Sequence, residues 1–221
     1  MALSRNPAIV GESAPPVNDV LGWRPTEKGP PVVSRRFIDA LGYAARLHAK
    51  QIRKRTERPY IGHLLGVTSI VIEYGGDEQT AIAALLHDAV EDQGGLPRLR
   101  EIRRKFGERV ARIVDGCTDS YTDPKPPWRE RKLAYIQRVA GEANDVRLAS
   151  AADKLANVRE TIHDFRAHGD FVFEKFQGKK EGTLWYYRAL VDVFRRAGTN
   201  ALIQELDRAV GELEALARLS R

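Results

Sequence analysis

The sequence predicts an all-α protein, an HD-domain-like bundle of roughly eight or more helices. Three observations predict it. Apolar residues recur at steps of three and four along most of the chain after Arg36, glycine and proline residues separate these stretches, and no pair of alternating, strand-like segments appears. With 221 residues, 43% of them hydrophobic and 30% charged, the chain has a globular composition. We therefore expect one domain over residues 35–221.

Residues 1–34 precede this domain as a proline-rich, possibly flexible arm without a sustained helical or strand period. They also lack the charged and apolar regions of a secretory signal. The longest apolar run, Ala81 to Leu86, is far short of the roughly 20 residues of a membrane span. The single cysteine, Cys117, excludes an internal disulfide. We expect a cytoplasmic protein that does not cross a membrane.

The first helix is expected from Arg36 to about Arg53, because Phe37, Leu41 and Ala44 lie on one helical face. A second helix carries Leu64 to Val71 and stops at Gly75-Gly76, and a third starts at Asp77 or Glu78 and stops at Gly94-Gly95. The later helical faces are expected at Leu99 to Phe106, Val110 to Val114 after Gly107, Glu130 to Ala140, Val146 to Ile162, Leu184 to Phe194 and Leu202 to Leu216. Residues 119–129 are expected as a proline-rich loop.

Four ionisable residues, His87, Asp88, Glu91 and Asp92, directly follow an apolar half turn. On one continuous helix the three carboxylates would share a face, since they lie three and four residues apart. No lysine or arginine within that turn offsets their repulsion. A divalent cation would do so, and the segment therefore predicts a metal site.

Two further residues have the chemistry to complete such a site. His63 follows Tyr60-Ile61-Gly62, and Asp153 follows Ala151-Ala152, so each stands among small or apolar neighbours. Either one alone is typical of a structural histidine or a salt-bridged aspartate. Together with His87 and Asp88 they make a set of two imidazoles and two carboxylates, which suits Mn²⁺, Fe²⁺, Co²⁺ or Zn²⁺.

The order His, His-Asp, Asp resembles the HD superfamily of metal-dependent phosphohydrolases. Within it, the chain resembles the hydrolase domain of the RelA/SpoT homologues over about residues 37–200. Five collinear blocks carry this resemblance: His48 to Lys54, Pro59 to His63, Ala83 to Asp92, Phe106 to Val110 and Ala152 to Arg159. The resemblance implies removal of the 3′-pyrophosphate from guanosine tetra- and pentaphosphate, part of the stringent response.

The resemblance also implies roles for single residues. It implies that the metal, expected to be Mn²⁺, is bound by His63, His87, Asp88 and Asp153. It also implies that the catalytic pair is Glu91 and Asp92. The residues implied to bind the substrate are Arg53, Lys54, Lys154 and Asn157. An aromatic residue among Trp185, Tyr186 and Tyr187 is implied as well, but the alignment is looser there. Two positions depart from the family pattern: Leu64 stands where a proline usually follows the first metal histidine, and residues 55–58 replace a glycine-rich link.

We therefore expect a stand-alone alarmone hydrolase whose partner is a small nucleotide. A divalent cation lowers the pKa of its bound water toward about 7, which makes that water the expected nucleophile. Adenosine alarmones and another phosphorylated nucleotide such as NADPH are alternative substrates. A non-catalytic nucleotide-binding regulator is the other class, as is nucleic-acid binding through the basic residues 98–112, which the net charge of +6 makes worth considering. The oligomeric state, the native metal and the acid and base roles within the pair stay open.

Overall fold

The computed structural model describes residues 34–122 and 124–220. In chain order the helices are α2 (Arg35–Leu47), α3 (Ile61–Glu73), α4 (Glu78–Leu86), α5 (Ala89–Asp92), α6 (Gly95–Cys117), α7 (Trp128–Val139), α8 (Asn144–His168), the 3₁₀ helix η1 (Gly169–Lys175), α9 (Lys179–Ala197) and α10 (Ala201–Leu219). The predicted arm, residues 1–34, lies outside the described residues except for Ser34, whose hydroxyl accepts a hydrogen bond from the Arg36 N–H and caps α2.

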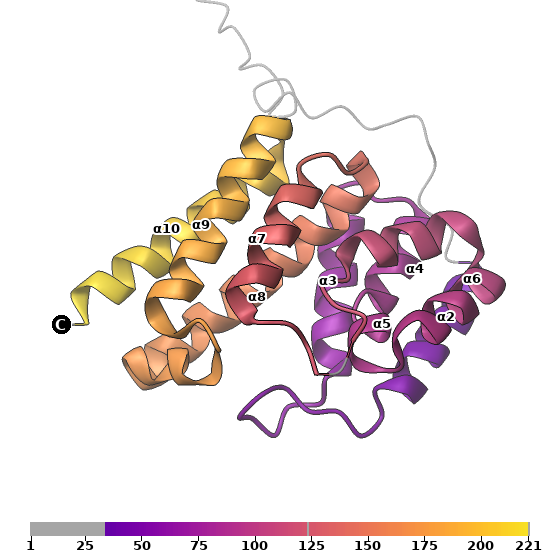
Figure 1. Ribbon diagram of the computed structural model, residues 1–221, viewed down its shortest axis with the longest axis horizontal. Coiled ribbons are helices and arrows are strands. Elements are labelled where there is room, and N and C mark those ends of the chain that lie inside the picture. Colours follow the sequence, from indigo (N-terminus) through magenta and orange to yellow (C-terminus); the bar gives the residue numbers. More distant parts are fainter. Residues whose placement is uncertain (1–33, 123, 221) are drawn as a thin grey trace, which may run out of the picture. The chain divides into compact units, whose positions relative to one another are not determined.

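The predicted all-α architecture is confirmed (Figure 1). Among residues 34–122 and 124–220, strand-type backbone pairing is limited to one isolated antiparallel bridge between Ile52 and Pro59. Over the same residues, every helix is too short or too polar to cross a membrane.

Helices α4 and α8 lie between two apolar clusters. Ile82 and Leu85 of α4 join a cluster with α2 and α6, whereas Ala81 and Ala84 face a second cluster with α8, α9 and α10. Because α4 is covered on all sides, all its residues from Thr80 to Leu86 are buried. The buried α4 therefore fixes the chain that leaves its C-terminal end, which is where His87 and Asp88 lie.

The first helix is shorter than the sequence predicts: α2 ends at Leu47, not near Arg53. His48 is buried, its ring stacks on Tyr60 at 5.4 Å, and its Nδ1 lies 2.7 Å from Gln51 Oε1. The backbone then pairs across a short loop, because Tyr60 N–H bonds to the Gln51 carbonyl and Arg53 N–H to the Arg58 carbonyl. These contacts replace the helix and bring Arg53 beside α8.

The third predicted helix is divided in two, which corrects the expectation of one helix up to Gly94. Helix α4 ends at Leu86, His87 and Asp88 form a turn, and α5 begins at Ala89. His87 Nδ1 lies 2.8 Å from the Ala84 carbonyl, the acceptor that a continuing helix would offer to the Asp88 N–H. The side chain thus competes with the helical hydrogen bond at the break.

Helix α6 contains a kink at Gly107, between the two predicted helical faces. Gly107 has φ 82°, in the left-handed region that disfavours every residue with a Cβ. We expect Gly107→Ala to lower the free energy of unfolding by about 1 kcal/mol, measured by urea denaturation. The matched control is Gly211→Ala within α10, where an added Cβ meets nothing within 4 Å. This control should raise stability by about 0.5–1 kcal/mol, and equal effects of the two variants would contradict the account of the kink.

The remaining helices follow the predicted order. Helix α7 begins at Trp128, two residues before the predicted start, and shortens the proline-rich loop accordingly. The stretch without a predicted element forms η1. This helix begins directly after α8 at Gly169, which has φ 58°. Helices α9 and α10 pack against each other and, through α10, against α8. Together they cover the side of α8 that carries Leu155, Val158 and Ile162.

Candidate active site

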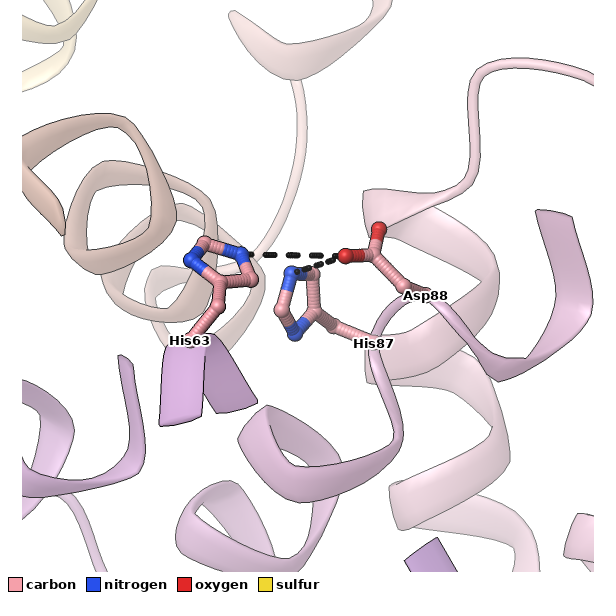
Figure 2. Close-up of side chains that lie close together, drawn as sticks. All are labelled: His63, His87 and Asp88. Atoms are coloured by element: carbon pink, nitrogen blue, oxygen red, sulfur yellow. Dashed lines mark ion pairs between the residues drawn. The ribbon is translucent and has the colours of Figure 1, made fainter. Parts of the chain in front are cut away.

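Three separate parts of the fold bring the four predicted metal ligands together. His63 lies in the first turn of α3, His87 and Asp88 form the turn between α4 and α5, and Asp153 lies in the middle of α8. Figure 2 shows His63 and His87 directed at the Asp88 carboxylate. The distances are 3.7 Å from His63 Nε2 and 3.0 Å from His87 Nε2 to Asp88 Oδ2, and 3.2 Å and 3.6 Å from the same nitrogens to Asp153 Oδ1.

The histidines present two unpaired nitrogens to this cluster. His87 Nδ1 lies against the Ala84 carbonyl and must donate to it, so Nε2 carries the lone pair in the neutral ring. Within the described part of the chain, the Nε2 atoms of His63 and His87 are buried without a hydrogen-bond partner. Burial lowers the pKa of His87, but the nearby Asp88 and Asp153 carboxylates outweigh it and hold the pKa well above its usual value. The raised pKa means that His87 Nε2 binds a proton, and a divalent cation between the histidines and carboxylates would take the place of this proton.

The two carboxylates are oriented by neighbouring donors. The Tyr60 hydroxyl donates to Asp88 Oδ2 at 2.5 Å. Lys154 donates to Asp153 Oδ2, and Asn157 Nδ2 donates to Asp153 Oδ1 at 2.5 Å from one turn along α8. Such contacts fix the direction of a ligating carboxylate and are typical of groups that support a metal ligand. The residues present therefore fit a divalent cation bound by nitrogen and oxygen.

The predicted catalytic pair lies on α5, next to the cluster but with different partners. Glu91 Oε1 accepts a hydrogen bond from Lys125 Nζ at 2.6 Å, whereas Asp92 Oδ2 accepts one from Gln51 Nε2 at 2.8 Å. Burial and then the Asp119 and Asp88 charges raise the pKa of Glu91 to about 7, although Lys125 opposes the shift. A carboxyl with this pKa is suited to give or take a proton at neutral pH.

The raised pKa of Glu91 predicts a pH-dependent stability of the metal-free protein. The folded state binds a proton that the unfolded state, with a Glu pKa near 4.5, has lost, so this contribution is present below pH 4.5 and disappears as the pH rises through about 7. Glu91→Gln removes it. In EDTA we expect the variant to match wild type near pH 4.5 and to be more stable by up to about 3 kcal/mol at pH 8, measured by urea denaturation. A stability difference independent of pH would contradict the shift.

A cavity of about 500 Å³ opens beside the cluster. All four predicted substrate residues line it: Arg53, Lys54, Lys154 and Asn157. Carboxylates also lie in its wall, among them Glu91, Asp92, Asp119 and Glu160. The aromatic and further cationic side chains that line it are Tyr60, Lys125, Trp128, Arg131, Lys132, Tyr135, Lys175, Phe176, Tyr186 and Tyr187. Of the loosely assigned aromatic residues, Tyr186 and Tyr187 line the cavity, and Trp185 does not. The combination of cations and rings suits a phosphorylated ligand with a planar part.

The sequence did not predict a role for Asp119 or Lys125, because residues 119–129 were expected only as a loop. Asp119 accepts hydrogen bonds from Arg131, at 2.9 Å to each oxygen, and from Lys132 at 2.5 Å. Lys125 pairs with Glu91, a member of the predicted catalytic pair, from the same loop. The proline-rich sequence of this loop does not indicate these contacts, because they depend on the fold that places the loop beside α5.

Other histidines and arginines have contacts away from the metal cluster. His48 does not contact the two carboxylates but stacks on Tyr60, whose hydroxyl donates to Asp88. Leu64, at the position of the family's proline, is fully buried in the core. In the basic stretch 98–112, Arg109 and Arg112 both pair with Asp145, so part of its charge is neutralised by ion pairs.

Comparisons with known proteins show what the chain is similar to. The sequence model of the HD domain family matches residues 40–184. Guanosine-3′,5′-bis(diphosphate) 3′-pyrophosphohydrolase MESH1 of Xenopus tropicalis is 40% identical over 127 residues, which cover 56% of this chain and 68% of the relative. Guanosine-3′,5′-bis(diphosphate) 3′-pyrophosphohydrolase of Aquifex aeolicus is 39% identical over 130 residues, 58% of this chain and 18% of the longer relative.

A solved structure gives the same result for the fold. It is described as a metazoan orthologue of SpoT that hydrolyses ppGpp, and it superposes on this chain with a TM-score of 0.68 and 30% sequence identity. The superposition covers 82% of this chain and 97% of the other. The HD domain match over residues 40–184 includes the four predicted metal ligands and the predicted catalytic pair.

Proposed function

Since the chain belongs to the HD domain family, we propose that it is a metal-dependent hydrolase that removes the 3′-pyrophosphate of guanosine tetra- and pentaphosphate. The relatives named for this reaction support the substrate. The observation that carries the proposal is the pair of unpartnered histidine nitrogens facing two carboxylates at the wall of a cavity that lysine, arginine and aromatic side chains line. The cytoplasmic location stays a prediction.

We assign the metal to His63, His87, Asp88 and Asp153, and we propose Mn²⁺ as the native ion. This ion accepts imidazole and carboxylate ligands together. When bound, a divalent cation supplies positive charge to phosphoryl oxygens and acidifies a coordinated water. The donors Tyr60, Lys154 and Asn157 then keep the two carboxylates directed at the ion.

The reaction needs water to attack the phosphorus bound to the 3′-oxygen. A bond forms from the water oxygen to phosphorus, the phosphorus–O3′ bond breaks, and the proton lost by water balances the one gained by the 3′-hydroxyl. GDP or GTP and pyrophosphate are the products. Glu91 and Asp92 are the residues suited to hold and move these protons, because both lie on α5 at the cavity.

The remaining cavity residues bind the nucleotide. Lys54 and Lys154 supply positive charge for phosphate oxygens. Arg53, in the loop before α3, and Asn157, one turn of α8 after Asp153, supply hydrogen-bond donors. Lys125 pairs with Glu91 in the free protein. A phosphate entering the cavity would compete for this lysine and release the carboxyl for proton transfer.

Pyrophosphate release from guanosine tetraphosphate by purified protein loaded with Mn²⁺ tests the function. The assay needs an EDTA control and the matching adenosine nucleotide. We expect metal-dependent release from the guanosine substrate. Pyrophosphate release from the adenosine nucleotide alone, or phosphate release from NADPH alone, would be compatible with the proposed metal site but would contradict the proposed guanosine substrate. Nucleotide binding without any product would support the regulator instead.

A further inference from the structure

Arg53 is fixed at the edge of the cavity by two residues of α8. Its Nε lies 3.3 Å from Glu160 Oε1, and its Nη2 donates to Glu160 Oε2 and, at 2.8 Å, to Asn157 Oδ1. The side chains of Arg53 and Glu160 are only 17% and 18% exposed. The Tyr60 ring covers a face of the guanidinium, with its centroid 5.4 Å from Cζ. The planar group is therefore held by its edge and by one face.

Counting donors shows what this arrangement leaves free. A guanidinium has five N–H donors. The contacts with Glu160 and Asn157 use the one on Nε and the two on Nη2. Among the residues that the structure describes, none accepts from Nη1, which keeps both of its donors. Arg53, Asn157 and Glu160 all line the cavity, so the free end of the guanidinium belongs to the wall that a ligand meets.

Glu160 also determines how strongly Arg53 attracts anions. The ion pair with Glu160 offsets the Arg53 charge at close range, whereas Lys54 makes no ion pair among the described residues. The Arg53 guanidinium, paired along one edge and 17% exposed, keeps two free N–H groups that can donate to the acceptors of a base or sugar, while the unpaired Lys54 can supply point charge for a phosphate.

A second arginine reaches Glu160 from outside the cavity. Arg58 Nη1 lies 3.4 Å from Glu160 Oε1 and its Nη2 lies 2.6 Å from Asp164 Oδ1, while its side chain is 47% exposed. Arg58 connects the loop before α3 to α8 but does not line the cavity. A variant of Arg58 therefore tests the attachment of the loop separately from the orientation of Arg53.

We infer that Glu160 is a positioning residue for the nucleotide: it holds the Arg53 guanidinium side-on so that the two Nη1 donors meet the base or sugar. This role rests on the proposed function, because it takes the ligand to be a nucleotide. The hydrogen bonds and ion pairs of Glu160 within the described residues are with Arg53 and Arg58 and not with the assigned metal ligands, so its loss should weaken binding and leave the chemical step intact.

The test compares Glu160→Gln, Arg58→Gln and Arg53→Ala with wild type. Glu160→Gln keeps the size of the side chain and removes its charge. We expect Kd for GDP, measured by calorimetry on Mn²⁺-loaded protein, and KM for guanosine tetraphosphate to rise about tenfold, the loss of one charge-assisted hydrogen bond. The kcat, the metal content and the melting temperature should stay at the wild-type level. Arg58→Gln should change none of these values.

Adding Glu160→Gln to Arg53→Ala should cause no further loss of GDP affinity, because the two residues act as one unit. Additive losses in this double mutant would overturn the role, as would equal effects of Arg58→Gln and Glu160→Gln or an unchanged Kd in Glu160→Gln. Calorimetry does not depend on turnover. Wild type that binds GDP without hydrolysing the tetraphosphate would refute the proposed function alone, and wild type that does not bind GDP would refute the positioning role as well.

Discussion

His63→Ala is expected to remove the metal and to lower activity at least about 10³-fold, since the charge stabilisation that a metal supplies is worth several kcal/mol. His63 Nε2 faces Asp88 and Asp153 at 3.7 Å and 3.2 Å and has no partner of its own among the described residues. Alanine deletes this nitrogen and leaves the two carboxylates facing each other with one imidazole. The measurement is metal content after gel filtration, alongside pyrophosphate release.

The control for this prediction is His163→Ala. His163 is an exposed histidine of the same helix as Asp153, and it lies away from the cavity. It should keep wild-type metal content and turnover. Because His63 is buried at the start of α3, melting curves in EDTA must show that the His63 variant is folded. Full activity or full metal content in folded His63→Ala would refute the assignment of this residue to the metal.

The sequence predicted the helices well where one apolar face decides the structure. Leu64 to Val71 and the glycines after them correctly bounded α3, and Gly107 correctly separated the two halves of α6. The errors occur where polar side chains compete with the helix. Contacts of His48 with Gln51 and Tyr60 end α2 early, and the contact of His87 with the Ala84 carbonyl divides the third predicted helix. Periodicity cannot predict such contacts, because they depend on which side chains the fold brings into reach.

The same distinction applies to the site. The proximity of the four predicted metal ligands was predictable because His63, the His87-Asp88 pair and Asp153 stand in motifs with unusual surroundings. The fold places the two histidine Nε2 atoms 3.0 to 3.7 Å from the two carboxylates. Lys125 and Asp119 were not predictable, since they come from a loop whose position over α5 depends on the packing of α7. Glu160 escaped as well: a glutamate on a charged helix gives no sign that it will meet an arginine 107 residues away in the chain.

Glu91→Gln is expected to keep the metal and to lower kcat about 10²- to 10⁴-fold, the usual range for losing a general acid or base. Glu91 makes no contact with the nitrogens of His63 or His87, and its ion pair is with Lys125. A glutamine still accepts a hydrogen bond from that lysine but cannot take or give the proton that the pKa of about 7 makes available to Glu91.

The control for Glu91→Gln is an acid-to-amide change at an exposed position of α2, Asp39→Asn, which should leave kcat unchanged. Metal content and the KM for guanosine tetraphosphate should stay near wild type in Glu91→Gln. The raised pKa of Glu91 predicts an inflection near pH 7 in the pH–rate profile of wild type, and this inflection should be missing from the variant. Loss of metal equal to that in His63→Ala would make Glu91 a ligand rather than a proton carrier. An unchanged kcat would transfer the proton-carrying role to Asp92, whose hydrogen bond from Gln51 orients its carboxylate at the same cavity wall.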